Sequence, residues 1–150
     1  MIAILAAALV ASPFTSFEGH WHCEGRFIAS GKAIVSELAM GVDAKSGIFV
    51  VHHDDAAPME YHSMEIWTSN RADAFLYSAV VDRFSGLRVF RSPALHNGEL
   101  AFSRSENGAV VEEFRYALTA PGTLRIGWSV VRAGKPLALG DTLACRRDGA

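Results

Sequence analysis

The sequence predicts an all-β protein: a single antiparallel up-and-down β-barrel of about ten strands. Three observations support this prediction. Short segments alternate in polarity, turn residues separate them at regular intervals, and two cysteines lie near opposite ends of the chain. A chain of 150 residues has about the length of one domain, so one barrel can account for most of it.

The first sixteen residues differ in kind from the rest. Residues 2–11 form an uninterrupted run of apolar and small side chains, which Ser12 and Pro13 follow. Such a run is typical of the hydrophobic region of a secretory signal peptide. Because no Lys or Arg precedes it, an ordinary apolar first segment is the alternative. We therefore divide the chain into residues 1–16, a signal peptide or apolar N-terminal segment, and residues 17–150, the barrel domain.

From residue 18 onward, nine breaks rich in glycine and proline divide the chain into ten segments. The breaks lie at residues 30–32, 45–47, 54–58, 69–73, 85–86, 92–98, 107–108, 121–122 and 133–136. Every proline after Pro13 lies in one of them, where its missing N–H does not interrupt strand pairing. The spacing predicts short strands joined mostly by tight turns.

The segments alternate in polarity as half-buried strands do. In residues 20–27 the even positions are polar, and the odd positions hold Trp21, Cys23, Gly25 and Phe27. Residues 110–118 and 124–130 show the same period of two. This pattern is typical of antiparallel strands with one buried face. Helical periodicity is weak throughout, and residues 32–40 are the one stretch that a helix would also fit.

The two cysteines favour a closed barrel. Cys23 lies in the first predicted strand and Cys145 in the last, and these strands are antiparallel neighbours in a closed barrel with an even number of strands. A disulfide there would stabilise the fold by roughly 4–5 kcal/mol in the chain-entropy description. The same register places Trp21 opposite Arg147, where a guanidinium can stack on an indole ring. The alternative is two separate buried thiols.

The composition argues against several classes of function. The net charge is −2, and Arg146 and Arg147 are the largest basic cluster, so a nucleic-acid partner is not expected. No apolar run approaches the ~20 residues of a transmembrane helix. No Gly-x-Ser-x-Gly, His-Glu-x-x-His or phosphate-binding loop is present, so we assign no catalytic residue and lean against an enzyme.

The fourth predicted strand supplies the first candidate ligand-binding residues. Tyr61, Glu65 and Trp67 share one face of it. A core stripe does not usually contain a glutamate, whereas ligand cavities combine apolar walls with a few polar groups. The alternative is that this is the outer face of the barrel.

Two arginines are candidates as well. Arg88 and Arg115 could point inward and meet an acidic group of a ligand. Buried unpaired charge is costly, so an inward arginine would need Glu65, Glu112 or the ligand as its partner. The alternative is a pair of solvated arginines on the outer face.

Histidines and carboxylates end the third predicted strand, as His52, His53, Asp54 and Asp55. Neighbouring strand residues point to opposite faces, so His52 and His53 cannot both face one cavity. Such residues could hold Zn²⁺ or act as an acid–base pair, and the alternative is a polar strand end. We place His53 among the candidate ligand-binding residues and assign no metal ligand. His20 and His22 lie opposite the Trp21 face and are expected to point to solvent.

Gly19-His20-Trp21 at the head of the first strand, with Arg147 beside it on the last, resembles the lipocalin and calycin signature. In that superfamily a late arginine packs over the tryptophan and closes the barrel. Residues 19–27, 30–32, 51–55, 61–67 and 140–146 resemble an uncharacterised bacterial family of small secreted calycin-like barrels. The resemblance implies a fold and a periplasmic or secreted location, and it brings no established activity.

Nitrobindin-type haem barrels share the Gly-x-Trp start but hold haem through a histidine on a late strand. Here no histidine follows His96, so neither haem nor another cofactor is expected. Our leading hypothesis is an exported, non-catalytic barrel that binds a small apolar or amphiphilic molecule. The alternatives are a small metal-assisted or acid–base enzyme that uses residues 52–55, and a structural or interaction barrel with a filled core.

Overall fold

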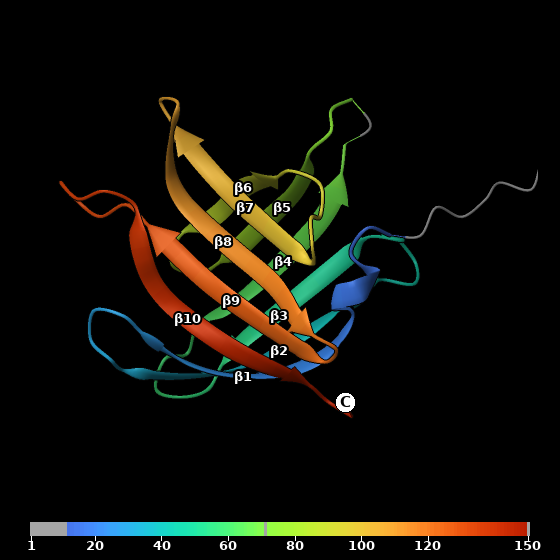
Figure 1. The fold of residues 1–150 in the computed structure, drawn as a ribbon, viewed down its shortest axis with the longest axis horizontal. Coiled ribbons are helices and arrows are strands. Elements are labelled where there is room, and N and C mark those ends of the chain that lie inside the picture. Colours follow the sequence, from blue (N-terminus) through green and yellow to red (C-terminus); the bar gives the residue numbers. More distant parts are fainter. Residues whose placement is uncertain (1–11, 71, 150) are drawn as a thin grey trace, which may run out of the picture.

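The protein is a closed antiparallel β-barrel. A computed structural model describes residues 12–70 and 72–149, so most of the predicted signal segment lies outside the described residues. Within them, ten strands pair in sequence order and the last pairs with the first, as Figure 1 shows. The predicted fold class is confirmed. None of the helical turns in these residues has the length or hydropathy needed to cross a bilayer.

A 3-10 turn and ten strands make up the fold. The turn is η1 (Thr15–Phe17). The strands are β1 (Gly19–Phe27), β2 (Ala33–Val42), β3 (Phe49–Asp55), β4 (His62–Ser69), β5 (Leu76–Asp82), β6 (Gly86–Ser92), β7 (Glu99–Glu106), β8 (Ala109–Ala120), β9 (Thr123–Val130) and β10 (Ala138–Arg147). The stretch that a helix would also have fitted forms most of β2.

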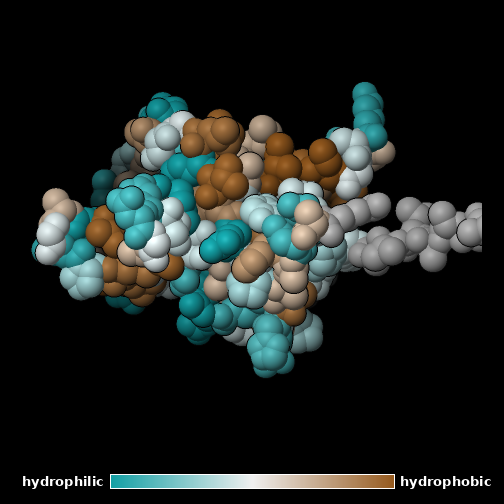
Figure 2. All heavy atoms as spheres, turned by 90° about the horizontal axis from the view of Figure 1, so that it is seen from above, coloured by the Kyte–Doolittle hydropathy of each residue, from teal (hydrophilic) through white to brown (hydrophobic). Residues whose placement is uncertain are grey.

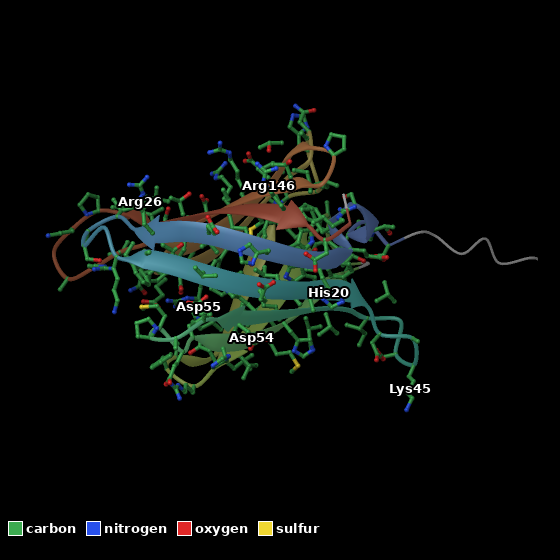
Figure 3. All side chains as sticks on the ribbon, turned by 90° about the horizontal axis from the view of Figure 1, so that it is seen from below. His20, Arg26, Lys45, Asp54, Asp55 and Arg146 are labelled. Atoms are coloured by element: carbon green, nitrogen blue, oxygen red, sulfur yellow. A yellow bond between two sulfur atoms is a disulfide. The ribbon has the colours of Figure 1, made fainter. Side chains whose placement is uncertain are left out.

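Strands β1 and β10 close the barrel in the predicted register. Cys23 pairs with Cys145 and Trp21 with Arg147. The two cysteines form a disulfide, and the Arg147 guanidinium lies 4.5 Å from the centre of the Trp21 ring. Figure 3 shows β10, β1, β2 and β3 side by side, with His20 and Arg146 on their outer surface. His20 and His22 are exposed, as the alternation requires.

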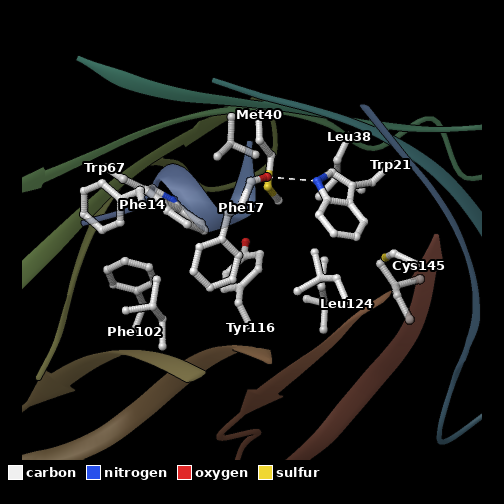
Figure 4. Packing of buried hydrophobic residues seen from close by; sticks show 14 of the residues in the cluster. Phe14, Phe17, Trp21, Leu38, Met40, Trp67, Phe102, Tyr116, Leu124 and Cys145 are labelled. Carbon is white, nitrogen blue, oxygen red and sulfur yellow. Dashed lines mark hydrogen bonds between the residues drawn. The ribbon is translucent and has the colours of Figure 1, made fainter. Parts of the chain in front are cut away.

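The η1 turn plugs one end of the barrel. Phe14 and Phe17 are buried, and their rings lie 5.5 and 5.6 Å from that of Trp67. The Trp21 indole N–H donates to the Phe17 carbonyl at 2.9 Å, the contact drawn in Figure 4. Phe14 therefore belongs to the barrel core, although the division made from the sequence placed it in the N-terminal segment.

Aromatic side chains fill the half of the barrel next to this plug. The Trp67 ring packs against Phe49, Phe102 and Tyr116 at centroid distances of 5.4, 5.1 and 4.9 Å. These residues come from β3, β4, β7 and β8, so they bridge the interior (Figure 4). The hairpins β1–β2, β3–β4, β5–β6, β7–β8 and β9–β10 surround the opposite end, which we call the open end.

The barrel wall is weakest between β6 and β7. These strands share one paired position, Arg91 with Ser103, whereas the other neighbouring strands pair along most of their length. The outer face of β4–β6 also carries exposed apolar side chains, among them Met64, Val81, Leu87 and Val89. Figure 2 shows the molecule from above, and hydrophobic side chains gather on part of that face.

Candidate functional site

The open end contains a cavity of about 290 Å³. Its lining divides into two chemical classes. The apolar and aromatic wall includes Phe27, Ile34, Met59, Phe84, Phe114, Ile126, Trp128 and Leu143. The polar lining includes His53, Asp55, Tyr61, Asp82, Arg88 and Asp141. An apolar wall with a few polar groups is the usual composition of a small-molecule site.

Strand alternation places His53 and Asp55 on the inner face of β3, while His52 points outward and is exposed. The His53 Nε2 lies 3.0 Å from Asp55 Oδ1. The Ser36 hydroxyl of β2 donates to the same oxygen at 2.5 Å. The Asp55 carboxylate thus orients the imidazole, and the serine in turn orients the carboxylate.

Tyr61 stands next to this pair. Its ring meets the His53 ring edge-on, with centroids 5.4 Å apart. Burial raises the pKa of the Tyr61 phenol to about 12. Tyr61 is therefore a neutral hydroxyl in the cavity wall at neutral pH, able to donate one hydrogen bond to a ligand.

Arg88 points inward from β6, and its guanidinium is already paired with carboxylates of the protein. Its guanidinium donates to Asp82 and to Glu112. Glu112 also accepts from the Trp128 indole N–H at 3.0 Å and from Arg104 Nε at 3.2 Å. These contacts link β5, β6, β7, β8 and β9, and they bridge the poorly paired seam between β6 and β7.

Asp82 is held as a carboxylate. Burial alone would raise its pKa, but the peptide N–H groups of Ser85 and Phe84 and the charge of Arg88 lower the pKa below its ordinary value. Both peptide N–H groups lie 2.7 Å from Asp82 Oδ1. Asp82 therefore anchors the β5–β6 turn and neutralises Arg88.

Asp141 differs from the other carboxylates of the cavity. It follows a β-bulge in β10, where the pairing with β9 shifts between Leu139 and Asp141. Bulges commonly redirect side chains beside functional sites. Among residues 12–70 and 72–149, no side chain hydrogen-bonds to the Asp141 carboxyl. Burial raises its pKa to about 6, the charge of His53 opposes that rise, and Asp55 adds to it.

The glycine of this bulge shapes the wall beside Asp141. A Cβ on Gly140 would lie 2.8 Å from Cε3 of the Trp128 ring. Trp128 pairs with Asp141 across β9 and β10. Gly140 therefore lets the indole lie against β10, next to the carboxyl.

Glu65 and Trp67 point inward but lie in the filled half of the barrel. Glu65 is 3% exposed and accepts hydrogen bonds from Trp67 at 2.8 Å, Tyr116 at 3.0 Å and Ser78 at 3.3 Å. Burial raises the pKa of the Tyr116 phenol well above its ordinary value. Neither Glu65 nor Trp67 lines the cavity, because their positions along β4 place them beside the η1 plug.

Arg115 lies on the outer face of β8, away from the cavity. It pairs with Glu99 and, at 2.9 Å, with Glu113. Of the six ligand-binding residues expected from the sequence, the structure thus brings His53, Tyr61 and Arg88 together at the cavity. It leaves Glu65, Trp67 and Arg115 outside.

Sequence reasoning missed Asp82, Trp128 and Asp141 as lining residues. The signal for Asp141 was present, because it shares the parity of Leu143 and Cys145, both of which point inward. In the described part of the chain, no three His, Cys, Asp or Glu side chains form a group that could hold a metal ion. Comparison with protein-family models and with curated proteins finds no match for this sequence.

Proposed function

We propose that the protein is a non-catalytic, calycin-like binding barrel that holds a small amphiphilic molecule in the cavity at its open end. The observation that supports this most is the contrast between the two halves of the interior. Aromatic rings fill one half, while the other half keeps a cavity of about 290 Å³. Protein interiors are normally close-packed, so a space of this size is maintained at the expense of packing contacts.

The size of the cavity limits the ligand. It equals about ten water volumes at roughly 30 Å³ each. It also lies near the lower end of the ~300–1,000 Å³ range of small-molecule pockets. We infer a compact ligand, or the buried part of a longer amphiphile that leaves through the mouth of the barrel. Phe84 lines the cavity and is 64% exposed, so it provides an apolar surface at that mouth.

The disulfide and the N-terminal apolar run support a location outside the cytoplasm. Cys23 and Cys145 are 0% and 1% exposed, and their bond joins the first and last strands. Structural disulfides of this kind persist in oxidising compartments and are rare in the cytosol. The apolar run of residues 2–11 agrees with export.

One observation favours acid–base catalysis as a second candidate function. His53 faces the cavity with one ring nitrogen held by Asp55, which is the arrangement that orients a general base. For metal-assisted catalysis, the described residues contain no group of three or more side chains that could hold a metal ion. A His53→Ala variant separates the two functions. If the variant catalyses the same reactions at the same rates as the wild type, acid–base catalysis by His53 is excluded, whereas ligand binding depends on the cavity as a whole.

The binding proposal is tested by extraction and by a neutral apolar probe. Protein purified from its native host is analysed by native mass spectrometry and solvent extraction, and titrated with the uncharged dye N-phenyl-1-naphthylamine. We expect a bound small molecule and saturable dye fluorescence. Ile126→Trp, which fills the cavity from β9, should abolish dye binding, and Val35→Trp on the outer face of β2 should not. An empty protein that does not bind the dye would contradict the proposal.

A further inference from the structure

The charges that line the cavity are predominantly negative. Within the described residues, Asp55, Asp82 and Asp141 contribute three carboxyl groups, against the guanidinium of Arg88 and the imidazole of His53. A cavity of this composition disfavours an anionic ligand. It selects for a cation or a strong hydrogen-bond donor, provided that some of the carboxylates are not already satisfied.

Arg88 and Asp82 are largely occupied by contacts within the protein, and Asp55 is partly occupied. Arg88 binds Asp82 through Nη2 and Glu112 through Nη1, so it neutralises Asp82 and both of its terminal nitrogens are paired, while its Nε is buried without a partner among the described residues. In Asp55, both Ser36 and His53 bond to Oδ1. Among the residues that the structure describes, no hydrogen-bond donor reaches Asp55 Oδ2.

Asp141 is the carboxyl group that remains. It faces the cavity and has no side-chain partner among the described residues. A desolvated carboxylate with no cation bonded to it is unfavourable, and burial moves its pKa up to about 6 although the charge of His53 and the Trp128 peptide N–H act in the opposite direction. Even so, it is mostly ionised at neutral pH, by about ten to one. A group that lowers stability in this way while facing a cavity is a typical functional-site feature.

An aromatic surface accompanies the carboxyl group. Trp128 pairs with Asp141 across the strands. A hydrogen bond to Glu112 holds the indole of Trp128, and Gly140, which has no Cβ, leaves room for the ring. Indole faces attract ammonium groups by roughly 0.5–2 kcal/mol, depending on desolvation. The bulge thus places a carboxylate and an aromatic wall on the same side of the cavity.

We propose that the polar head of the ligand is a protonated primary or secondary amine, held by Asp141 and Asp55 against the Trp128 ring. This inference rests on the proposed binding function and names its ligand class. An ammonium group with two or more N–H donors has enough donors for Asp141 and for the free oxygen of Asp55, whose charge already acts on Asp141 across the cavity. The apolar part of the ligand then lies along Phe27, Ile34 and Ile126.

The test compares three probes with the same hydrocarbon chain: hexylamine, hexanol and hexanoate. Isothermal titration at about pH 7.5 should give hexylamine at least tenfold tighter binding than hexanol, and hexanoate the weakest. Asp141→Asn should remove the preference for hexylamine over hexanol. Asp148→Asn makes the same change in net charge at an exposed site and should preserve the preference.

The pH profile of the wild-type protein gives a second readout that needs no variant at Asp141. The amine preference should decline as Asp141 gains its proton, on going below about pH 6. The groups facing Asp141 are His53 and Asp55 from β3, the Trp128 peptide from β9 and Phe27 opposite on β1. The profile is repeated in His53→Gln, where the decline should persist with its midpoint at a higher pH, because the charge of His53 no longer opposes the rise in the Asp141 pKa.

The outcomes separate this inference from the proposed function. If none of the three probes binds, the binding function fails and the inference fails with it. If hexanol binds but hexylamine is no tighter, or if Asp141→Asn keeps the preference, the amine inference is wrong while the binding function stands. Tightest binding by hexanoate would show that a cationic side chain, and not a carboxylate, anchors the ligand head, and would also overturn the inference.

Discussion

The Arg147 guanidinium on the last strand lies over the Trp21 ring on the first, 4.5 Å from its centre, and also donates to the Ser16 carbonyl at 2.6 Å. One side chain thus links the barrel closure to the N-terminal plug. Arg147→Lys should lower the free energy of unfolding by about 0.5–2 kcal/mol, because lysine lacks the planar guanidinium that stacks on the indole ring. Arg146→Lys, on the exposed neighbour, should change it by less than about 0.5 kcal/mol. Chemical denaturation measures both, and equal effects would contradict the account.

The disulfide should contribute measurably to stability. Replacing both cysteines in Cys23→Ala/Cys145→Ala frees a loop with a sequence separation of 122 residues. We expect a loss of about 2–5 kcal/mol in the free energy of unfolding, with retention of the β-sheet circular-dichroism spectrum if the strand pairing suffices to close the barrel. A denaturation midpoint equal to that of the wild type would show that the bond adds nothing to closure.

Asp141 should contribute a destabilisation at neutral pH that disappears at acidic pH. Its pKa is raised to about 6 in the folded state from an ordinary value of 3.8, so the folded protein binds the proton more tightly. The destabilisation is fully present above about pH 6 and is lost as the pH falls towards 4. Asp141→Asn should therefore raise the free energy of unfolding by about 1–3 kcal/mol at pH 8 and change it little at pH 4. Asp148→Asn is the control, and a loss of stability in Asp141→Asn at pH 8 would contradict this reasoning.

Gly140 should be required for the shape of the cavity wall. In Gly140→Ala the new Cβ would lie 2.8 Å from the Trp128 ring, so the indole must move into the cavity or the bulge must shift. We expect a loss of about 1–3 kcal/mol in stability and weaker binding of the dye probe. Gly41→Ala is the matched control, because a Cβ there meets nothing within 4 Å. Unchanged dye binding in Gly140→Ala would show that this wall is not part of the site.

Strand alternation predicted which face each residue occupies more reliably than where it lies along the barrel. It set His52 and His53 on opposite faces of β3, and it gave the register of the closing strands. A period of two carries no information on the position of a residue along the barrel axis. Glu65 and Trp67 therefore point inward, as one of the two alternatives predicted, but they lie beside the plug and not at the cavity. The plug itself depends on Phe14 and Phe17, whose tertiary contacts no local pattern could indicate.

Two sites show what a closer reading of the same pattern could have found. The alternation that sets Tyr116 inside β8 also sets Arg115 outside, so its pairing with Glu113 on the outer face was predictable. Asp141 shares the parity of Cys145, but its isolation from other side chains arises from the bulge at Gly140 and from partners on distant strands. The pairing of Arg88 with Glu112 likewise depends on the arrangement of β6 and β8 in space.

The tryptophan indole N–H resonances provide the most direct test of a hollow open end. The chain has three tryptophans: Trp128 lines the cavity, whereas Trp21 and Trp67 are buried in the filled half. The three signals are recorded in ¹⁵N–¹H spectra during titration with hexanol and assigned with Trp128→Phe. The account predicts a saturable shift of the Trp128 signal while the other two stay in place. Three unchanged signals at saturating hexanol, or a shift confined to Trp21 or Trp67, would contradict it.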